Sequence, residues 1–185
     1  MISSIVARVL FYPSLAFNIL MEKISKRDWY NRIDEHVILG ALPLRSMSDT
    51  LVKEEGVTAV VSINEDYELR FLAYQPDEWK RIGVNNIRFQ VVDMFGAPSQ
   101  EVLIEGVDFI KKNIVNEGVV YVHCKAGRSR SATLVGCYLM EKNNWTPDEA
   151  VSFIKTKRPH ILIHPMKMQA LKDFYKNHVI PTSIN

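Results

Sequence analysis

The sequence predicts an α/β fold in which a central sheet is flanked by helices, and three observations support this prediction. Strand-like and helix-like segments alternate along the chain from Ile33 onward. A β-branched run at Val57–Ile63 is typical of a buried strand. Residues 146–149, with the sequence Thr-Pro-Asp-Glu, are typical of a helix start, since they combine a capping box with Pro at the first helical position. Neither an internal repeat nor an interdomain linker is visible, so we expect one domain.

The other elements follow from hydrophobic spacing and from residues that begin or end helices. Gly56 ends a short helix at residues 49–55, and Ser99 caps a helix that runs to about residue 115 with apolar side chains at helical spacing. Gly118 introduces a strand. We expect strands at residues 37–39, 57–63, 87–92 and 119–122, and helices at residues 49–55, 99–115, 131–142, from 146 onward, and 165–177.

Composition excludes several classes of protein. The chain has 185 residues, of which 47% are hydrophobic, so it can bury a sizeable core and is not intrinsically disordered. Two cysteines, Cys124 and Cys137, do not make a disulfide-rich scaffold, and their spacing is not that of a Cys-x-x-Cys site. We expect no metal site, because His160 and His164 share a possible helix face but lack a third ligand.

Charge is unevenly distributed although the net charge is only +2. Residues 150–185 contain six bases and one acid, Asp173. Two interpretations remain open: this stretch faces an anionic membrane or nucleic acid, or it is a solvated helix face. The six bases are Lys155, Lys157, Arg158, Lys167, Lys172 and Lys176.

The N-terminal segment, residues 1–27, differs from the rest of the chain. Residues 9–20 are nearly continuous apolar sequence, and the bases Lys23, Lys26 and Arg27 follow. The run is too short to cross a bilayer, which requires about 20 residues. We assign residues 1–27 to targeting or membrane association and residues 28–185 to a single domain. A mitochondrial presequence, an interfacial anchor and a helix packed on the domain are the alternatives.

Residues 123–131, with the sequence His-Cys-Lys-Ala-Gly-Arg-Ser-Arg-Ser, carry the strongest chemical signal. They connect an expected strand to an expected helix. Such a loop can turn its backbone N–H groups inward at Gly127, beside the positive end of the helix, and so form a cradle for an anion. The cradle should lower the pKa of Cys124 and favour its thiolate. Arg130 supplies a planar fork that fits two oxygens of a phosphate. We therefore expect a phosphate site with a cysteine nucleophile, and we place Cys137 in the core.

This stretch resembles the signature loop of the cysteine-dependent phosphatases, the protein tyrosine and dual-specificity superfamily: His-Cys, five residues, Arg, then Ser or Thr. The resemblance implies a dual-specificity phosphatase fold with a mixed sheet. It also implies attack by Cys124 on phosphorus, a phosphocysteine intermediate that water hydrolyses, and no cofactor. In this family Arg130 would hold the equatorial oxygens, Ser131 would hydrogen-bond the leaving sulfur, and His123 would brace the loop. Phosphate would bind to Lys125, Ala126, Gly127, Arg128 and Ser129.

The same resemblance requires a general acid on the loop after the preceding strand. Asp93 stands there, directly after residues 87–92 and before a possible mobile loop. The alternative is that Asp93 only forms a turn. Lys125 and Arg128 make the loop similar to those of phosphatases that act on phospholipids, unless both charges are solvated at the rim.

Further blocks are similar to the family of mitochondrial phosphatidylglycerophosphate phosphatases, first classed as mitochondrial dual-specificity protein tyrosine phosphatases. This family would place the protein at the matrix face of the mitochondrial inner membrane, on the route to cardiolipin. It implies an anionic phospholipid substrate and a membrane surface as partners, without nucleic acid or an obligate protein partner. The blocks are residues 28–33, 38–43, 64–68, 92–94 and 121–133.

An acidic segment of that family is linked to lipid substrates, and here it consists of Glu65, Asp66, Tyr67 and Glu68, with one Glu shortened to Asp. An equally open alternative is that these acids stabilise the first turn of a helix capped by Asn64. The leading hypothesis for the chain is a phosphoric monoester hydrolase that acts on phosphatidylglycerophosphate. The alternatives are a dual-specificity or tyrosine protein phosphatase, a phosphoinositide phosphatase, and a phosphate-binding adaptor without turnover.

Overall fold

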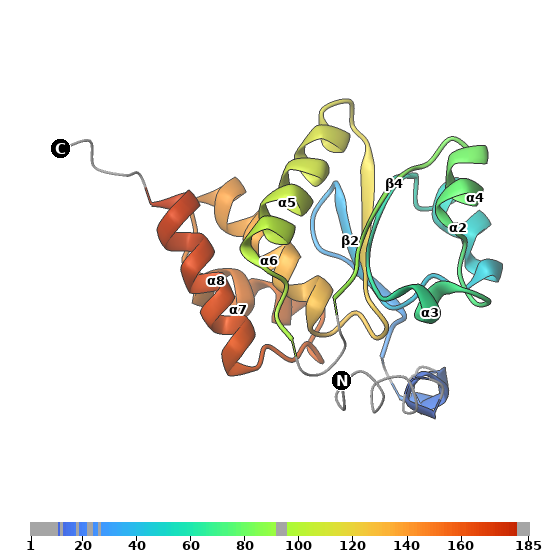
Figure 1. The fold of residues 1–185 in the computed structure, drawn as a ribbon, viewed down its shortest axis with the longest axis horizontal. Coiled ribbons are helices and arrows are strands. Elements are labelled where there is room, and N and C mark those ends of the chain that lie inside the picture. The colour runs from blue at the N-terminus through green and yellow to red at the C-terminus, as the bar shows by residue number, and fades with distance from the viewer. Residues whose placement is uncertain are drawn as a thin grey trace.

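The computed structural model describes residues 11, 13–17, 19–21, 24, 25, 27–91 and 96–180. Its centre is a five-stranded sheet with the order β1-β2-β5-β3-β4 (Figure 1). β1 is antiparallel to β2, and the other neighbours are parallel. The sheet is therefore mixed, which confirms the expected fold class. The strands are β1 (Tyr30–Arg32), β2 (Val37–Gly40), β3 (Val57–Ile63), β4 (Asn85–Phe89) and β5 (Val119–His123).

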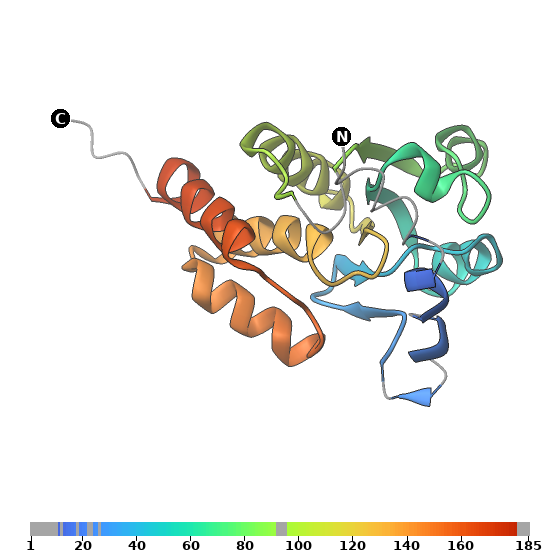
Figure 2. The same ribbon diagram turned by 60° about the horizontal axis from the view of Figure 1, so that its bottom comes forward.

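Helices cover both faces of the sheet. The two views agree that α6, α7 and α8 lie on one side and that α2 and α4 lie on the other (Figures 1 and 2). The helical elements are η1 (Arg45–Met47), α2 (Ser48–Lys53), α3 (Asp66–Leu69), α4 (Pro76–Arg81), α5 (Gln100–Ile114), α6 (Arg130–Asn143), α7 (Pro147–Lys157), α8 (Pro165–Phe174) and the π-helical turn η2 (Tyr175–Val179).

Most of the predicted elements are present, and the differences have physical causes. β3 has the predicted bounds, whereas the predicted strand at residues 87–92 starts and ends earlier, at Asn85–Phe89. β4 is an edge strand that pairs only with β3, so its hydrogen bonding ends where β3 ends, at the pair Ile63↔Phe89. The prediction missed β1 and α4. The helix that was one interpretation of the acidic segment is present as α3, but its N-cap is Glu65 and not Asn64. β1 has three residues, which is too few for a recognisable period.

The larger core cluster lies between the sheet and the helices α5 to α8. α6 is at its centre, and every residue from Arg130 to Met140 is buried. A helix surrounded on all sides needs apolar residues around its whole circumference, which explains why a free cysteine is tolerated there. Burial raises the pKa of Cys137 well above its usual value, so this thiol is inert and belongs to the core, as predicted.

The described part of the N-terminal segment is helical and packs on the domain. Phe11 and Leu15 are buried in a small cluster with Leu42, Leu69 and Ala73. These contacts favour the packed-helix interpretation, while the targeting role stays a prediction. Among the described residues, no helix has the length and apolar character needed to cross a membrane.

Candidate active site

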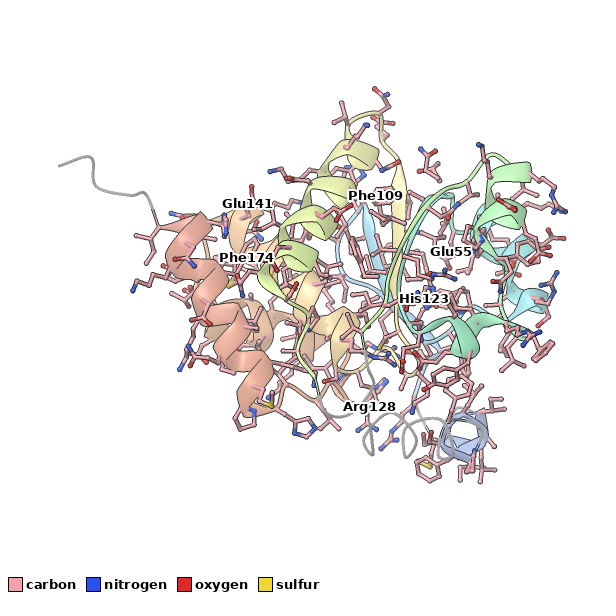
Figure 3. All side chains as sticks on the ribbon, in the orientation of Figure 1. Glu55, Phe109, His123, Arg128, Glu141 and Phe174 are labelled. Carbon is pink, nitrogen blue, oxygen red and sulfur yellow. The ribbon has the colours of Figure 1, made fainter. Side chains whose placement is uncertain are left out.

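The four parallel strands end at the same edge of the sheet, and the loop that follows β5 lies there. This loop, residues 124–129, connects the buried end of β5 to the first turn of α6. Figure 3 labels His123 within the sheet and Arg128 at the lower edge of the molecule, at the end where the N-terminal helical segment lies. Parallel α/β sheets place ligand sites at this edge, beyond the carboxyl ends of the strands.

The carbonyl groups of the loop accept hydrogen bonds from the surrounding elements. Lys125 O accepts from Leu42 N at 3.2 Å, and Arg128 O accepts from Leu162 N at 2.7 Å. Ser129 O accepts from the backbone N–H of Thr133, within α6, at 2.9 Å. In a trans peptide the N–H points away from the preceding carbonyl, and no described peptide bond is cis. The amides that follow these carbonyls therefore point to the opposite side, which is the geometry of an anion cradle.

Arg158 donates hydrogen bonds to two further carbonyl groups of the loop. Its Nε donates to Gly127 O at 2.7 Å and its Nη2 to Ala126 O at 3.2 Å. Its Nη1 donates to Asn31 Oδ1 at 2.6 Å, which ties the loop to β1. The side chain is 1% exposed, and burial lowers the pKa of Arg158 to about 10.

Both interpretations of the basic C-terminal stretch are therefore wrong for Arg158, which faces neither solvent nor a membrane. Lys167, at the start of α8, is buried as well, so it does not belong to a solvated helix face. A basic run in a sequence does not reveal which of its members turns inward, so nothing in the local pattern marked Arg158. Buried backbone carbonyls need hydrogen-bond donors, and the sequence of the loop offers none for the carbonyls of Ala126 and Gly127. That requirement is the signal that could have indicated a donor from elsewhere in the chain.

Gly127 is required by the packing of the loop against β2. Its φ is +62°, in the left-handed region that favours glycine. A Cβ at this position would come within 2.3 Å of the carbonyl carbon and oxygen of Gly40. The loop thus approaches the end of β2 too closely for any side chain at Gly127.

Cys124 lies at the base of the pocket and is 3% exposed. Ser131 Oγ donates a hydrogen bond to Cys124 Sγ at 3.2 Å, which favours a thiolate over a thiol. Behind it, His123 contacts Ser62 Oγ through Nε2 at 2.7 Å and the carbonyl of Cys124 through Nδ1 at 3.4 Å. Burial lowers the pKa of His123 to about 3, so the ring is neutral and braces the loop without adding charge.

Arg130 is held in a buried, two-pronged ion pair with Glu68. Nη1 and Nη2 of Arg130 lie 2.9 and 3.0 Å from the two carboxylate oxygens of Glu68, and Nη1 also donates to Val91 O at 2.7 Å. The arginine is 1% exposed and the glutamate 0%. This fork fixes the plane of the guanidinium, as bidentate carboxylate pairs do.

Of the two interpretations of the acidic segment, the structure bears on the helix start alone, and it gives Glu68 a further role that neither interpretation contained; the link to lipid substrates stays a prediction. Glu68 also accepts a hydrogen bond from the backbone N–H of Glu65 at 2.7 Å, so it caps α3 as well as orienting Arg130. Asp66 points elsewhere and forms a salt bridge with Arg88 at 2.8 Å. Tyr67 packs edge-on against the ring of Phe11, and burial raises its pKa.

The pocket over the loop has a volume of about 280 Å³. Six of the nine predicted catalytic and phosphate-binding residues line it: Cys124, Lys125, Ala126, Arg128, Ser129 and Arg130. Ser14 and Phe17, from the N-terminal helical segment, line it too, as do Leu162, His164 and Lys167. The predicted acid, Asp93, lies outside the described residues.

The two extra cations of the loop are tethered. Lys125 is 7% exposed and its Nζ lies 3.0 Å from Ser14 Oγ. Arg128 is half-buried and donates from Nε to His160 O at 2.8 Å. Lys125 is therefore not a solvated charge at the rim of the loop, which was the alternative interpretation. His160 and His164 lie on the connection between α7 and α8 and do not share a helix face.

A cysteine and an arginine in one anion cradle, at the edge of a mixed α/β sheet, define a cysteine-dependent phosphatase. The family model of the dual specificity phosphatase catalytic domain matches residues 38–177. The chain therefore belongs to the dual specificity phosphatase family.

Relatives and solved structures agree with this assignment. The chain is 49% identical over 173 residues to phosphatidylglycerophosphatase and protein-tyrosine phosphatase 1 of Rattus norvegicus, covering 92% of this chain and 90% of that protein. It is 37% identical to phosphatidylglycerophosphate phosphatase PTPMT1 of Arabidopsis thaliana, covering 95% of this chain and 51% of that protein. The crystal structure of PTPMT1 in complex with PI(5)P is similar with a TM-score of 0.79 at 49% identity, covering 80% of this chain and 96% of that chain.

Proposed function

We propose that this protein removes the terminal phosphate of phosphatidylglycerophosphate and so produces phosphatidylglycerol, on the route to cardiolipin. The observation that carries this proposal is the pocket that combines Cys124, the Glu68-oriented Arg130 and the additional cation Lys125. Three cations in one loop fit a substrate with more than one negative charge. The similarity to proteins named for this substrate supports the same assignment.

The proposed reaction has two steps. The thiolate of Cys124 attacks phosphorus in line while the bond from phosphorus to the glycerol oxygen breaks, and Asp93 donates its proton to that oxygen. Water then attacks the phosphocysteine, Asp93 takes the proton from the water, and the phosphorus–sulfur bond breaks. Ser131 donates a hydrogen bond to the leaving sulfur, and Arg130 with the loop amides holds the equatorial oxygens throughout. The products are phosphatidylglycerol, inorganic phosphate and the free thiolate.

We place the reaction at a membrane surface, the matrix face of the mitochondrial inner membrane, with residues 1–27 as a targeting or association segment. Exposed apolar side chains support the contact with a membrane surface. Phe17, Leu20 and Ile24 are 52%, 51% and 66% exposed and recur at a spacing that puts them on one helix face. Leu162 and Met166 are also exposed, and Leu162 lines the same pocket as Phe17. Sedimentation with anionic vesicles tests the contact with a membrane surface. Phe17→Ser should weaken binding to the vesicles, whereas Val115→Ser, which changes an exposed position remote from the pocket, should not.

Two other substrates have specific support. A similar protein was crystallised with PI(5)P, and the names of the mammalian relatives include protein-tyrosine phosphatase. The experiment that decides compares kcat/KM on micellar phosphatidylglycerophosphate, on a phosphoinositide and on phosphotyrosine peptides. We expect the first to be largest and Cys124→Ser to abolish all three. A clear preference for phosphopeptides would contradict the lipid assignment, and phosphate release that survives Cys124→Ser would contradict the mechanism.

A further inference from the structure

The N-terminal helical segment forms part of the wall of the pocket. Ser14 and Phe17 line the same 280 Å³ pocket as Cys124. The segment is anchored there by Phe11, which is 0% exposed, and Leu15, which is 3% exposed. Buried apolar contacts therefore determine the position of the segment beside the cradle. As a result, the side chain of Ser14 has a defined location at the pocket.

Lys125 joins this segment to the signature loop. Its Nζ lies 3.0 Å from Ser14 Oγ and 5.8 Å from the centre of the Phe11 ring. A free lysine side chain loses up to about 2 kcal/mol of rotamer entropy when it is held in one place. A hydroxyl and an aromatic ring that hold the ammonium before substrate arrives reduce that loss at the moment of binding.

We infer that Ser14 is a positioning residue, which holds the ammonium of Lys125 in the pocket and makes the N-terminal helical segment a specificity element for lipid phosphate monoesters. This inference rests on the proposed function. The cradle amides and Arg130 suffice for one phosphate, and Lys125 lines the same pocket together with Arg128 and Lys167, so it lies where a further negative group of the substrate would bind. Loss of Ser14 should therefore harm a lipid with two phosphate groups more than a small aryl phosphate with one.

The test compares Ser14→Ala with a rescue variant and a matched control. Ser14→Thr keeps the hydroxyl. Ser25→Ala removes another serine hydroxyl of the same segment, one that bonds only to the carbonyl of Met21 among the described hydrogen bonds. Point variants are preferable to removal of residues 1–27, because truncation would also empty the core positions of Phe11 and Leu15.

For Ser14→Ala we expect the ratio of kcat/KM on micellar phosphatidylglycerophosphate to kcat/KM on an aryl phosphate to fall about tenfold, the effect of one hydrogen bond to a charged group. The loss should lie mainly in KM for the lipid. Ser14→Thr should restore most of the ratio, and Ser25→Ala should leave it at the wild-type value. An unchanged ratio in Ser14→Ala, or equal losses on both substrates, would overturn the inference. Failure of the proposed function would instead appear in the wild type, as a preference for phosphopeptides, and Ser14→Ala would then be assayed against that substrate with the same criterion.

Discussion

Glu68→Gln is the substitution whose effect the structure predicts most sharply. It keeps the shape of the side chain but removes the charge that compensates Arg130 in a site where both residues are at most 1% exposed. Removal of one partner from a buried ion pair costs about 3–5 kcal/mol, because it leaves an uncompensated buried charge. Gln retains one acceptor oxygen, and Val91 O still binds Nη1, so we expect the lower end of this range.

A loss of about 3 kcal/mol should lower the midpoint of thermal unfolding by about 6–12 °C in a domain of this size. Urea unfolding followed by circular dichroism measures the free energy directly. Activity on an aryl phosphate should fall as well, because the guanidinium plane is no longer fixed. The control is Asp49→Asn, whose partner Lys53 and own side chain are 71% and 78% exposed, and which should change the free energy of unfolding by about 0.5 kcal/mol or less.

A double-mutant cycle separates loss of the pair from general damage to the core. Glu68→Met combined with Arg130→Met removes both charges, so the double variant should be less destabilised than the sum of the two single variants. Additive losses in this cycle, or a loss below about 1 kcal/mol for Glu68→Gln, would refute the reasoning that the two side chains compensate each other.

Three further predictions concern the support of the loop. Arg158→Lys replaces a planar fork of donors by a point charge, so it should lower the free energy of unfolding by about 2 kcal/mol and reduce activity. Lys155→Met, at an exposed position, should change neither quantity. Thermal unfolding measures the first and phosphate release the second. Burial holds the pKa of His123 at about 3, below the usual 6.5, so as the pH falls the unfolded chain takes up the proton first. The contribution of His123 to stability is therefore complete above pH 6.5 and declines by about 1.4 kcal/mol per pH unit from there toward pH 3; a ring that titrates near 6.5 by NMR would contradict this. Gly127→Ala forces a Cβ into the backbone of Gly40 at a φ of +62°, and should destabilise the fold by at least about 2 kcal/mol in urea unfolding and abolish activity; a variant with normal turnover would show that the loop can move aside.

The sequence predicted what local patterns encode. Alternating periods predicted the α/β class, β3 was recognisable from its β-branched run, and the spacing from Cys124 to Arg130 marked the loop. Ser131 does lie within hydrogen-bonding distance of the sulfur, as the family resemblance implied.

What the sequence did not predict depends on contacts between distant segments. Arg158 and the loop carbonyls that it binds are about thirty positions apart, and Glu68 and Arg130 are separated by 62 positions. A short acidic segment is compatible with a helix cap and with an arginine partner, and only the fold shows that Glu68 does both. The same is true of Ser14, whose contact with Lys125 spans 111 positions.

The carbonyl contacts of the loop also bear on how the enzyme becomes active as it folds. Apart from Thr133 in α6, their donors come from the segment after β2, from the C-cap of α7 and from the connection to α8, so they span the chain from Leu42 to Leu162. The cradle cannot take its shape until these distant parts have docked, which makes it a late product of folding rather than a local motif. Phosphate turnover should therefore report completion of the whole domain, and chains that end before α7 should have no phosphatase activity.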